Sequence, residues 1–180
     1  MIDDSNRNHE ELIMTEPNAV RLTPKSALLV LIAIITLVTG YMLLGTALGV
    51  SDYLAMGFMF ALYWGGIKGM EPSEFAPAVL GSLSGIGLAY AVHVVPNAMG
   101  TLGLVAVLTT IIAIVYASLL HILPMIINNA LMLYLTIGTA SFFNQHEGFL
   151  KSVVAVILIA AYTGVLNIVI RKLKSRMRAL

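Results

Sequence analysis

Residues 26–49 read "SALLVLIAIITLVTGYMLLGTALG" and contain no charged side chain. A helix needs about 20 apolar residues to cross the hydrocarbon core of a bilayer, so this stretch is long enough. Its start also has helix-forming chemistry. Thr23 can cap the helix, and Pro24 suits the first helical position because its missing N–H would be unpaired there in any case. The stretch therefore predicts a membrane-spanning helix.

The rest of the chain repeats this pattern. Of the 180 residues 59% are hydrophobic and 11% are charged, with a mean hydropathy of +0.93, whereas soluble domains carry about 25% charged residues. We therefore expect an all-α protein, a polytopic bundle of transmembrane helices, with a polar tail over 1–25, a membrane domain over 26–170 and a basic tail over 171–180. The expected spans are 26–49, 52–69, 72–95, 98–121, 124–143 and 149–170.

Lysine and arginine indicate how the bundle is oriented. Six spans place nine of these residues on one side of the membrane and leave Lys151 on the other. The positive-inside rule makes the richer side the cytoplasm, so both termini are expected there. The basic C-terminal tail is expected to contact anionic lipid and not nucleic acid. The first 25 residues lack the order of a cleavable signal peptide. The nine residues are Arg7, Arg21, Lys25, Lys68, Arg171, Lys172, Lys174, Arg176 and Arg178.

Two adjacent asparagines interrupt the expected fifth span, "PMIINNALMLYLTIGTA" (124–140). Every unpaired amide in hydrocarbon costs a few kcal/mol, and Asn128 and Asn129 point to diverging faces, so each needs its own partner. Asn129 shares a face with Thr136. The third and sixth spans carry comparable stripes of small and weakly polar residues, with Ser82 in one and Thr163 and Asn167 in the other.

These stripes have two interpretations. Small residues let membrane helices approach closely, and asparagine, serine and threonine bond across such contacts. Alternatively, the same groups line a path for a solute. For Asn128 and Asn129 we favour the path, because one asparagine suffices to join two helices. For Asn167 and the glycines both interpretations stay open.

The end of the second span, "YWGGIKGMEPSEF" (63–75), is also unusual. Gly65 and Gly66 each weaken a helix by about 1 kcal/mol relative to alanine, and they follow Trp64 within or near the membrane. Irregular backbone at that depth is tolerated against protein or a water-filled cavity. Lys68 is interpreted either as a snorkelling cation paired with Glu71 or Glu74, or as the cation of a solute vestibule that includes Glu71.

Several classes of function have no residues to support them. The chain has no cysteine, which excludes disulfides, thiolate metal sites and cysteine nucleophiles. His93 is expected near the outer face of the membrane and His121 near the inner face, so they cannot share a metal or haem. We find no catalytic triad, carboxylate pair or HExxH motif, and expect no enzyme, metal or cofactor. The lack of a central charged residue argues against ion coupling.

Splitting the chain after the third span gives two halves of three helices. "FALYWGGIKGMEPSEF" (60–75) and "ALMLYLTIGTASFFNQHEGF" (130–149) share Leu-Tyr, glycine, a polar loop with a glutamate, and a closing phenylalanine. Halves of three helices insert with opposite orientation, so this pattern is typical of a 3+3 inverted repeat, and transporters built in this way bind solute near the repeat interface.

A family resemblance rests on three stretches: "GGIKGM" (65–70), the third span rich in glycine, serine and alanine, and "GTASFFNQHEGFLKSVVAVILIAAYTGVLNIVI" (138–170). Over residues 28–172 the chain resembles the small YcdZ-like bacterial inner-membrane proteins, a family of unknown function. The resemblance implies a multi-pass bundle in the bacterial inner membrane. It implies no reaction, ligand or catalytic residue.

The sequence thus favours an inner-membrane channel or facilitator for a small, polar, uncharged solute. A chain this small has little room to enclose a pore by itself, so a homo-oligomer is expected. The alternative is a membrane-embedded scaffold or accessory subunit whose asparagines and glycines serve helix packing. Lys68 and Glu71 form the expected vestibule. The expected path is lined by Asn128, Asn129, Thr136, Thr163, Asn167, Ser82, Trp64, Gly65 and Gly66.

Overall fold

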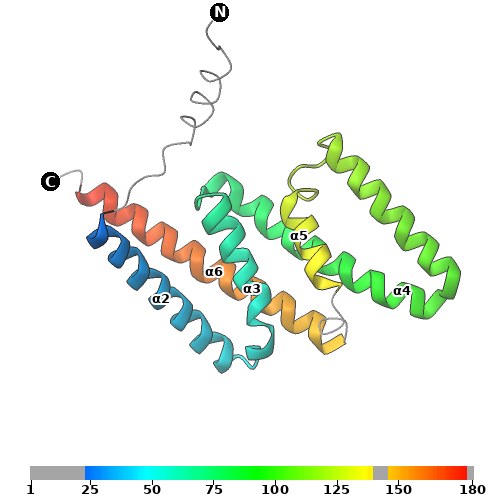
Figure 1. Ribbon diagram of the computed structural model, residues 1–180, viewed down its shortest axis with the longest axis horizontal. Helices are drawn as coiled ribbons and strands as arrows, with labels where there is room; N and C mark the ends of the chain where they lie inside the picture. Colours follow the sequence, from blue (N-terminus) through cyan, green and yellow to red (C-terminus); the bar gives the residue numbers. More distant parts are fainter. Residues whose placement is uncertain (1–22, 140–145, 178–180) are drawn as a thin grey trace, which may run out of the picture. The chain divides into compact units, whose positions relative to one another are not determined.

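The computed structural model describes residues 23–139 and 146–177, and every regular element in these two ranges is helical (Figure 1). The chain divides into two compact units, Met1–Val38 and Thr39–Leu180. Within the described residues the first unit holds the beginning of α2, and the second unit holds every contact between different elements that is discussed below. The elements are α2 (Pro24–Ala47), η1 (Ser51–Tyr53), α3 (Leu54–Phe60), η2 (Ala61–Ile67), α4 (Pro72–Leu119), α5 (Asn129–Gly138) and α6 (His146–Met177).

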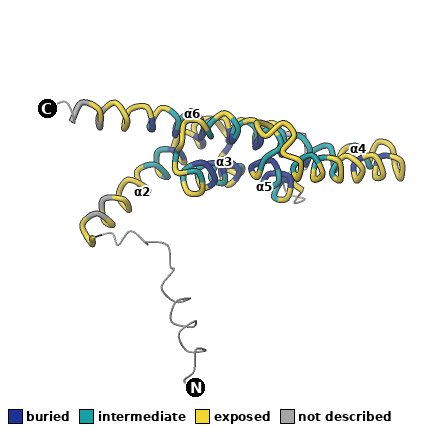
Figure 2. The backbone as a smooth tube through the Cα atoms, turned by 90° about the horizontal axis from the view of Figure 1, so that it is seen from above, coloured by how far each residue is buried: buried dark blue, intermediate teal, exposed yellow. Residues whose placement is uncertain are grey.

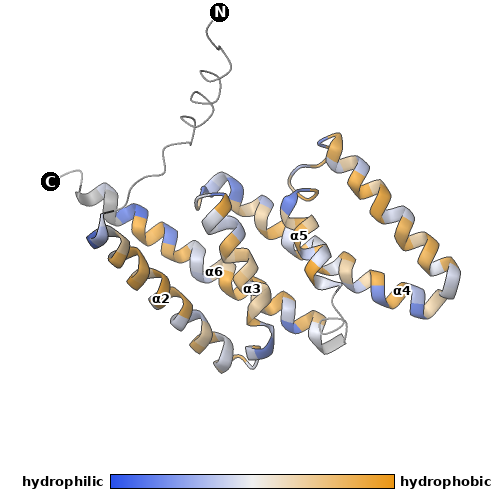
Figure 3. Cartoon of the chain, viewed as in Figure 1, coloured by the Kyte–Doolittle hydropathy of each residue, from blue (hydrophilic) through white to orange (hydrophobic). Residues whose placement is uncertain are grey.

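Three helices are long and apolar enough to cross a membrane. These segments are Val30–Ala47 in α2, Pro72–Leu119, which is all of α4, and Gly148–Lys172 in α6. Much of their apolar surface is exposed, as the orange stretches of Figure 3 and the yellow stretches of Figure 2 show for α2 and for the distal part of α4. Exposed apolar helices of this length are typical of a membrane protein.

Two of the expected helix starts are confirmed. α2 begins at Pro24, where the N–H of Ala27 donates to the carbonyl of Thr23 at 2.9 Å. α4 begins at Pro72 after Glu71, whose backbone is extended, and Glu74 lies in the first turn. Proline at the first position and an acidic residue near the positive end of the helix dipole both favour these starts.

The glycine pair of the second span lies in irregular helix, as expected. α3 continues directly into η2, a π-helix over Ala61–Ile67 that contains Gly65 and Gly66. The backbone then reverses through Gly69 and Met70, which have φ of +59° and +57°. A left-handed glycine just past a helix end is a common terminator. The helical segment from Ser51 to Ile67 is short for a bilayer.

The third and fourth expected spans both lie in α4, which bends sharply between them. The expected spans 72–95 and 98–121 put the break at about 96–97, and the structure places it at Gly100, with φ +59° and ψ −137°. Pro96 lies inside the helix and does not end it. Figure 1 shows the two limbs of α4, 72–99 and 101–119, running back on each other. Gly103 is buried against the backbone carbonyl of Val95, so its missing side chain lets the limbs close.

The expected start of the fifth span is wrong. We expected helix from Pro124 to Phe143 with the asparagines in its middle. Residues 120–128 instead form turns and bends, α5 begins at Asn129, and it ends at Gly138. Residues 140–143 lie outside the described residues. Asn128 is extended (φ −143°, ψ −179°), so no helix passes through it, and the backbone just before Pro124 is left-handed at His121 (φ +54°) and Leu123 (φ +53°).

The small-residue stripe of the third span is a helix-packing surface. The stripe lies against α5 and its N-cap. Gly81 faces Asn128, and Gly85 faces the backbone of Leu131. Ala89 faces Gly138. His93 continues the stripe but is exposed. On the other side of the second unit, α3 packs on α6, where Gly57 lies against the carbonyl of Ala155. α6 extends past the expected end at residue 170 to Met177.

Candidate functional site

The reversal between η2 and α4 is held by two predicted path residues. Trp64 donates its indole N–H to the carbonyl of Glu71 at 2.9 Å, and Asn167 on α6 donates its amide to the carbonyl of Met70 at 2.7 Å. The two side chains are 1% and 9% exposed. The two carbonyls belong to the reversal itself, so both side chains bond to the protein's own backbone and hold the turn in place.

Asn128 has a similar structural role at the start of α5. Its Oδ1 accepts from the backbone N–H groups of Ala130 (2.9 Å) and Leu131 (3.3 Å), which makes Asn128 the N-cap. Its Nδ2 donates to the carbonyl of Pro77 in α4 at 2.8 Å and, at longer distance, to the carbonyl of Pro124. Asn128 therefore caps one helix and ties it to another. Asparagine is among the best N-cap residues for this reason.

Asn129 is different, because its side chain is exposed and the residue lines a cavity of about 320 Å³. We call this cavity the polar pocket. Its volume is at the lower end of the range of ligand sites, about 300–1,000 Å³. Residues from η2, both limbs of α4, the 120–128 segment and α5 contribute to it. They are Tyr63, Lys68, Glu74, Pro77, Ser118, His121, Pro124, Met125, Ile127, Asn128 and Asn129.

The charges in the polar pocket are paired with each other. Lys68 Nζ lies 3.0 Å from Glu74 Oε2, with both side chains about a third exposed (32% and 40%). The hydrogen bond that Lys68 donates to Glu74 raises the pKa of Lys68 above its ordinary value, so the ammonium stays charged throughout the neutral range. Of the two partners expected for Lys68 the structure selects Glu74, and the side chain of Glu71 is exposed. The pair adds a dipole and little net charge to the pocket.

Strained backbone, in the form of positive φ at non-glycine residues, occurs in segments near the polar pocket. Met70, His121 and Leu123 are the non-glycine residues with positive φ in the described chain. Met70 closes the reversal after Lys68, and the other two shape the segment that lines the pocket. Such conformations cost about 1–3 kcal/mol each and cluster at functional sites. The π-helix of η2 is another feature that recurs at functional sites.

The other predicted path residues lie elsewhere. Ser82 and Thr163 are buried, and each hydroxyl donates to a carbonyl of its own helix, that of Ala78 (2.7 Å) and that of Ile159 (2.7 Å). Thr136 is exposed on α5 and bonds back to Met132 in the same way. Gly65 and Gly66 lie in η2, outside the lining of the polar pocket. The structure thus brings Asn128, Asn129 and Lys68 together, but not the hydroxyls.

Sequence reasoning missed most of the lining of the polar pocket. Among these residues, Tyr63 lies more than 50 positions before Ser118 and His121. One signal was present: an asparagine directly before an apolar run is an N-cap signature, and it would have placed Asn128 at a helix start. Among the residues that the structure describes, no three of His, Asp or Glu are grouped to hold a metal ion.

Ser152 gives a direct test of how α6 is packed. Its side chain is 1% exposed and, within the described chain, its Oγ has no hydrogen-bond partner. A buried hydroxyl without a partner costs about 1–3 kcal/mol. We expect Ser152→Ala to leave stability unchanged or raise it by about 1 kcal/mol, measured as the free energy of unfolding in a denaturing-detergent titration. Ser82→Ala is the control, because it removes a satisfied hydroxyl and should not stabilise. A clear loss in Ser152→Ala would mean that the hydroxyl is bonded.

Comparison with known proteins adds no relative: no family model, no curated protein and no solved structure matches this chain. The class of protein is therefore given by the fold itself, a helical protein with three helices long and apolar enough to cross a membrane.

Proposed function

We propose that this chain is an integral membrane channel or facilitator for a small, polar, uncharged solute. The observation that carries the proposal is the polar pocket, which is lined by the exposed Asn129 and by a self-neutralised Lys68–Glu74 pair. Carboxamide, hydroxyl and backbone groups can replace part of a solute's hydration without committing a net charge. The resemblance to YcdZ-like proteins is the basis for placing the chain in the bacterial inner membrane.

The proposed topology keeps six membrane segments of unequal length. The two limbs of α4 rise about 40 Å and about 28 Å, so each can cross a hydrocarbon core of about 30 Å. α2 and α6 supply two more full crossings. The segment Ser51–Ile67 and the segment containing α5 would enter the membrane as short elements. The segregation of lysine and arginine supports cytoplasmic termini.

Reciprocal packing supports the 3+3 inverted repeat. Within the second unit, the short helix of the first half, α3, packs on α6, the last helix of the second half. The short helix of the second half, α5, packs on the first limb of α4, the last helix of the first half. The short helices also bond to each other, since Tyr134 Oη donates to the carbonyl of Met56 at 2.5 Å. Transporters with inverted repeats bind solute beside such broken helices.

A homo-oligomer is part of this proposal. The second limb of α4 exposes a row of large apolar side chains that packing within the chain leaves uncovered. A second copy could cover this row, although lipid would satisfy it equally well. The row consists of Leu102, Leu104, Val105, Leu108, Ile112, Val115, Tyr116 and Leu119.

The test is stopped-flow swelling and shrinkage of proteoliposomes with a panel of small neutral solutes such as urea, formamide and glycerol. Asn129→Leu is the informative variant, because Asn129 opens to the pocket and no described hydrogen bond holds it. We expect facilitated entry of at least one solute, slowed about tenfold or more in Asn129→Leu, the equivalent of one lost hydrogen bond in the barrier. Thr136→Val on the same helix is the matched control and should keep the wild-type rate.

Asn128 is unsuitable for this purpose, because its substitution removes the cap of α5 and confounds transport with stability. If no solute enters faster than into protein-free vesicles, the proposal fails. It also fails in its present form if Thr136→Val slows entry as much as Asn129→Leu does, because the pathway would then lie away from the polar pocket.

A specific observation favours a second candidate, a membrane-embedded scaffold or accessory subunit. Three predicted path residues donate side-chain hydrogen bonds to backbone carbonyls, as residues that serve helix packing do: Trp64, Asn128 and Asn167. This candidate predicts co-purification with a larger membrane complex and no solute entry. Normal entry in the purified protein would count against it.

A further inference from the structure

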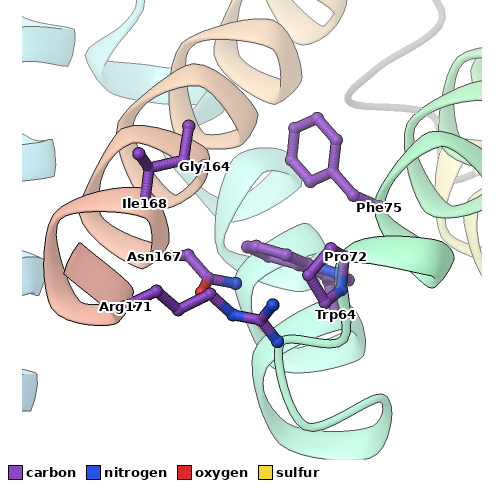
Figure 4. A pocket seen from close by; sticks show the side chains of 7 residues that line it. All are labelled: Trp64, Pro72, Phe75, Gly164, Asn167, Ile168 and Arg171. Atoms are coloured by element: carbon purple, nitrogen blue, oxygen red, sulfur yellow. The ribbon is translucent and has the colours of Figure 1, made fainter. Parts of the chain in front are cut away.

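A second cavity lies on the other side of the 68–71 reversal, between α6 and the start of α4. Its volume is about 180 Å³ and its lining is almost entirely apolar. Figure 4 shows the rings of Trp64 and Phe75 with Pro72 on one wall, and Gly164 and Ile168 of α6 on the other. The two rings pack edge to face, with their centroids 4.9 Å apart. We call this cavity the apolar pocket.

One cation borders the apolar pocket. The side chain of Arg171 lies along its edge, below Asn167, with the guanidinium directed toward Pro72 and Trp64 (Figure 4). The Arg171 side chain is exposed, and in the part of the chain that the structure describes no carboxylate pairs with it. The amide of Asn167 is already bonded to the carbonyl of Met70. The guanidinium of Arg171 is therefore the polar group at this pocket that is open to a ligand.

The pocket lies at the position along α6 where the apolar segment ends, which is where a membrane interface is expected. The apolar segment of α6 runs over Gly148–Lys172, so Arg171 stands at its last turn and the apolar lining lies on the membrane side of it. A basic stretch at the end of a span meets the negatively charged lipid surface of the cytoplasmic leaflet. Arginine binds phosphate with two parallel hydrogen bonds.

We propose that the apolar pocket and Arg171 form a specific site for one anionic phospholipid. An acyl chain occupies the apolar pocket, and the lipid phosphate is held by the Arg171 guanidinium at its mouth. This site is separate from the polar pocket and does not depend on the proposed transport function.

Gly164 is the residue that keeps the pocket open. A β-carbon added there would lie 3.3 Å from the ring of Phe75, so a larger side chain would project into the cavity. Gly164→Leu should therefore fill the pocket while leaving Arg171 in place. Gly87→Leu is its matched control, because a β-carbon at Gly87 on α4 meets nothing within 4 Å.

The experiment measures the thermal unfolding midpoint of the purified full chain in an uncharged detergent at 0.15 M salt, titrated with dioleoyl phosphatidylglycerol. At that salt a charge acts over about 8 Å, so a neighbouring lysine contributes little at a distance. We expect Arg171→Gln to raise the half-maximal lipid concentration about tenfold, and Lys172→Gln, the control for charge, to change it by no more than about twofold. Gly164→Leu should also weaken the response, and Gly87→Leu should not.

Equal losses in Arg171→Gln and Lys172→Gln would overturn the proposal, since the effect would then be diffuse attraction to the basic tail. Equal stabilisation by glycerol phosphate, which has no acyl chain, would overturn the role of the apolar pocket. Wild-type protein gives a test free of folding defects: phosphatidylglycerol with a photoreactive group in its acyl chain should label the peptides that contain Trp64 or Phe75. Labelling confined to other exposed apolar surface, or replacement of lipid by a second copy of the chain, would also overturn it.

Discussion

Gly85→Ala is expected to lower the free energy of unfolding by about 3 kcal/mol or more, or to prevent α5 from docking. A β-carbon at Gly85 would lie 2.5 Å from the carbonyl oxygen of Leu131 and 2.6 Å from Cβ of Tyr134. The first contact is with backbone, so no rotamer change relieves it and the two helices must separate. Separation also strains the bond from Tyr134 to the carbonyl of Met56.

The matched control is Gly87→Ala, two residues along the same helix. A β-carbon there meets nothing within 4 Å, and alanine is a better helix former than glycine by about 1 kcal/mol. Gly87→Ala should therefore be neutral or mildly stabilising in a denaturing-detergent titration. If Gly85→Ala behaves like Gly87→Ala, α4 and α5 are not packed through Gly85.

Gly81→Ala and Asn128→Ala are expected to be strongly coupled. Asn128→Ala removes an N-cap and the bond to Pro77 and should cost about 2 kcal/mol in all. Gly81→Ala should cost a similar amount, because its β-carbon would overlap the carboxamide of Asn128 and displace it. The double variant should lose about 2 and not about 4 kcal/mol, since the amide that clashes is already absent.

Additive losses in this double-mutant cycle would mean that Gly81 does not face Asn128. Gly81→Ala in the Asn128→Ala background is the sharpest comparison. There the change should be neutral or favourable, because only the gain in helix propensity remains.

Much of the fold was predictable from local chemistry. Proline at the first helical position located the starts of α2 and α4, and the adjacent Gly65 and Gly66 indicated irregular backbone, observed as a π-helix. The small-residue stripe of the third span was predicted as one helix face, and Gly85 and Ala89 on it lie against α5. Each of these predictions depends on residues within a turn or two of each other, which is where sequence patterns carry most information.

The misread fifth span shows where such reasoning ends. Apolar periodicity across 124–140 is compatible with a single helix, and nothing in a propensity scale marks His121 or Leu123 as left-handed. The end of this segment is held by a tertiary contact, the bond between Asn128 and Pro77, which are 51 residues apart. The polar pocket is assembled in the same way, from segments whose meeting no local pattern encodes.

The brevity of α5 has a consequence for how the protein is made. Ten residues of helix rise about 15 Å, half the thickness of the hydrocarbon core, and the turns before them leave polar backbone exposed. A segment of this kind is a poor substrate for insertion by itself. We expect α5 to enter the bilayer after the first limb of α4 is in place, with the Asn128–Pro77 bond forming as it docks. Biogenesis would then be ordered along the chain, and the α5 region should become protected from water-soluble labels only in chains that contain the first limb of α4.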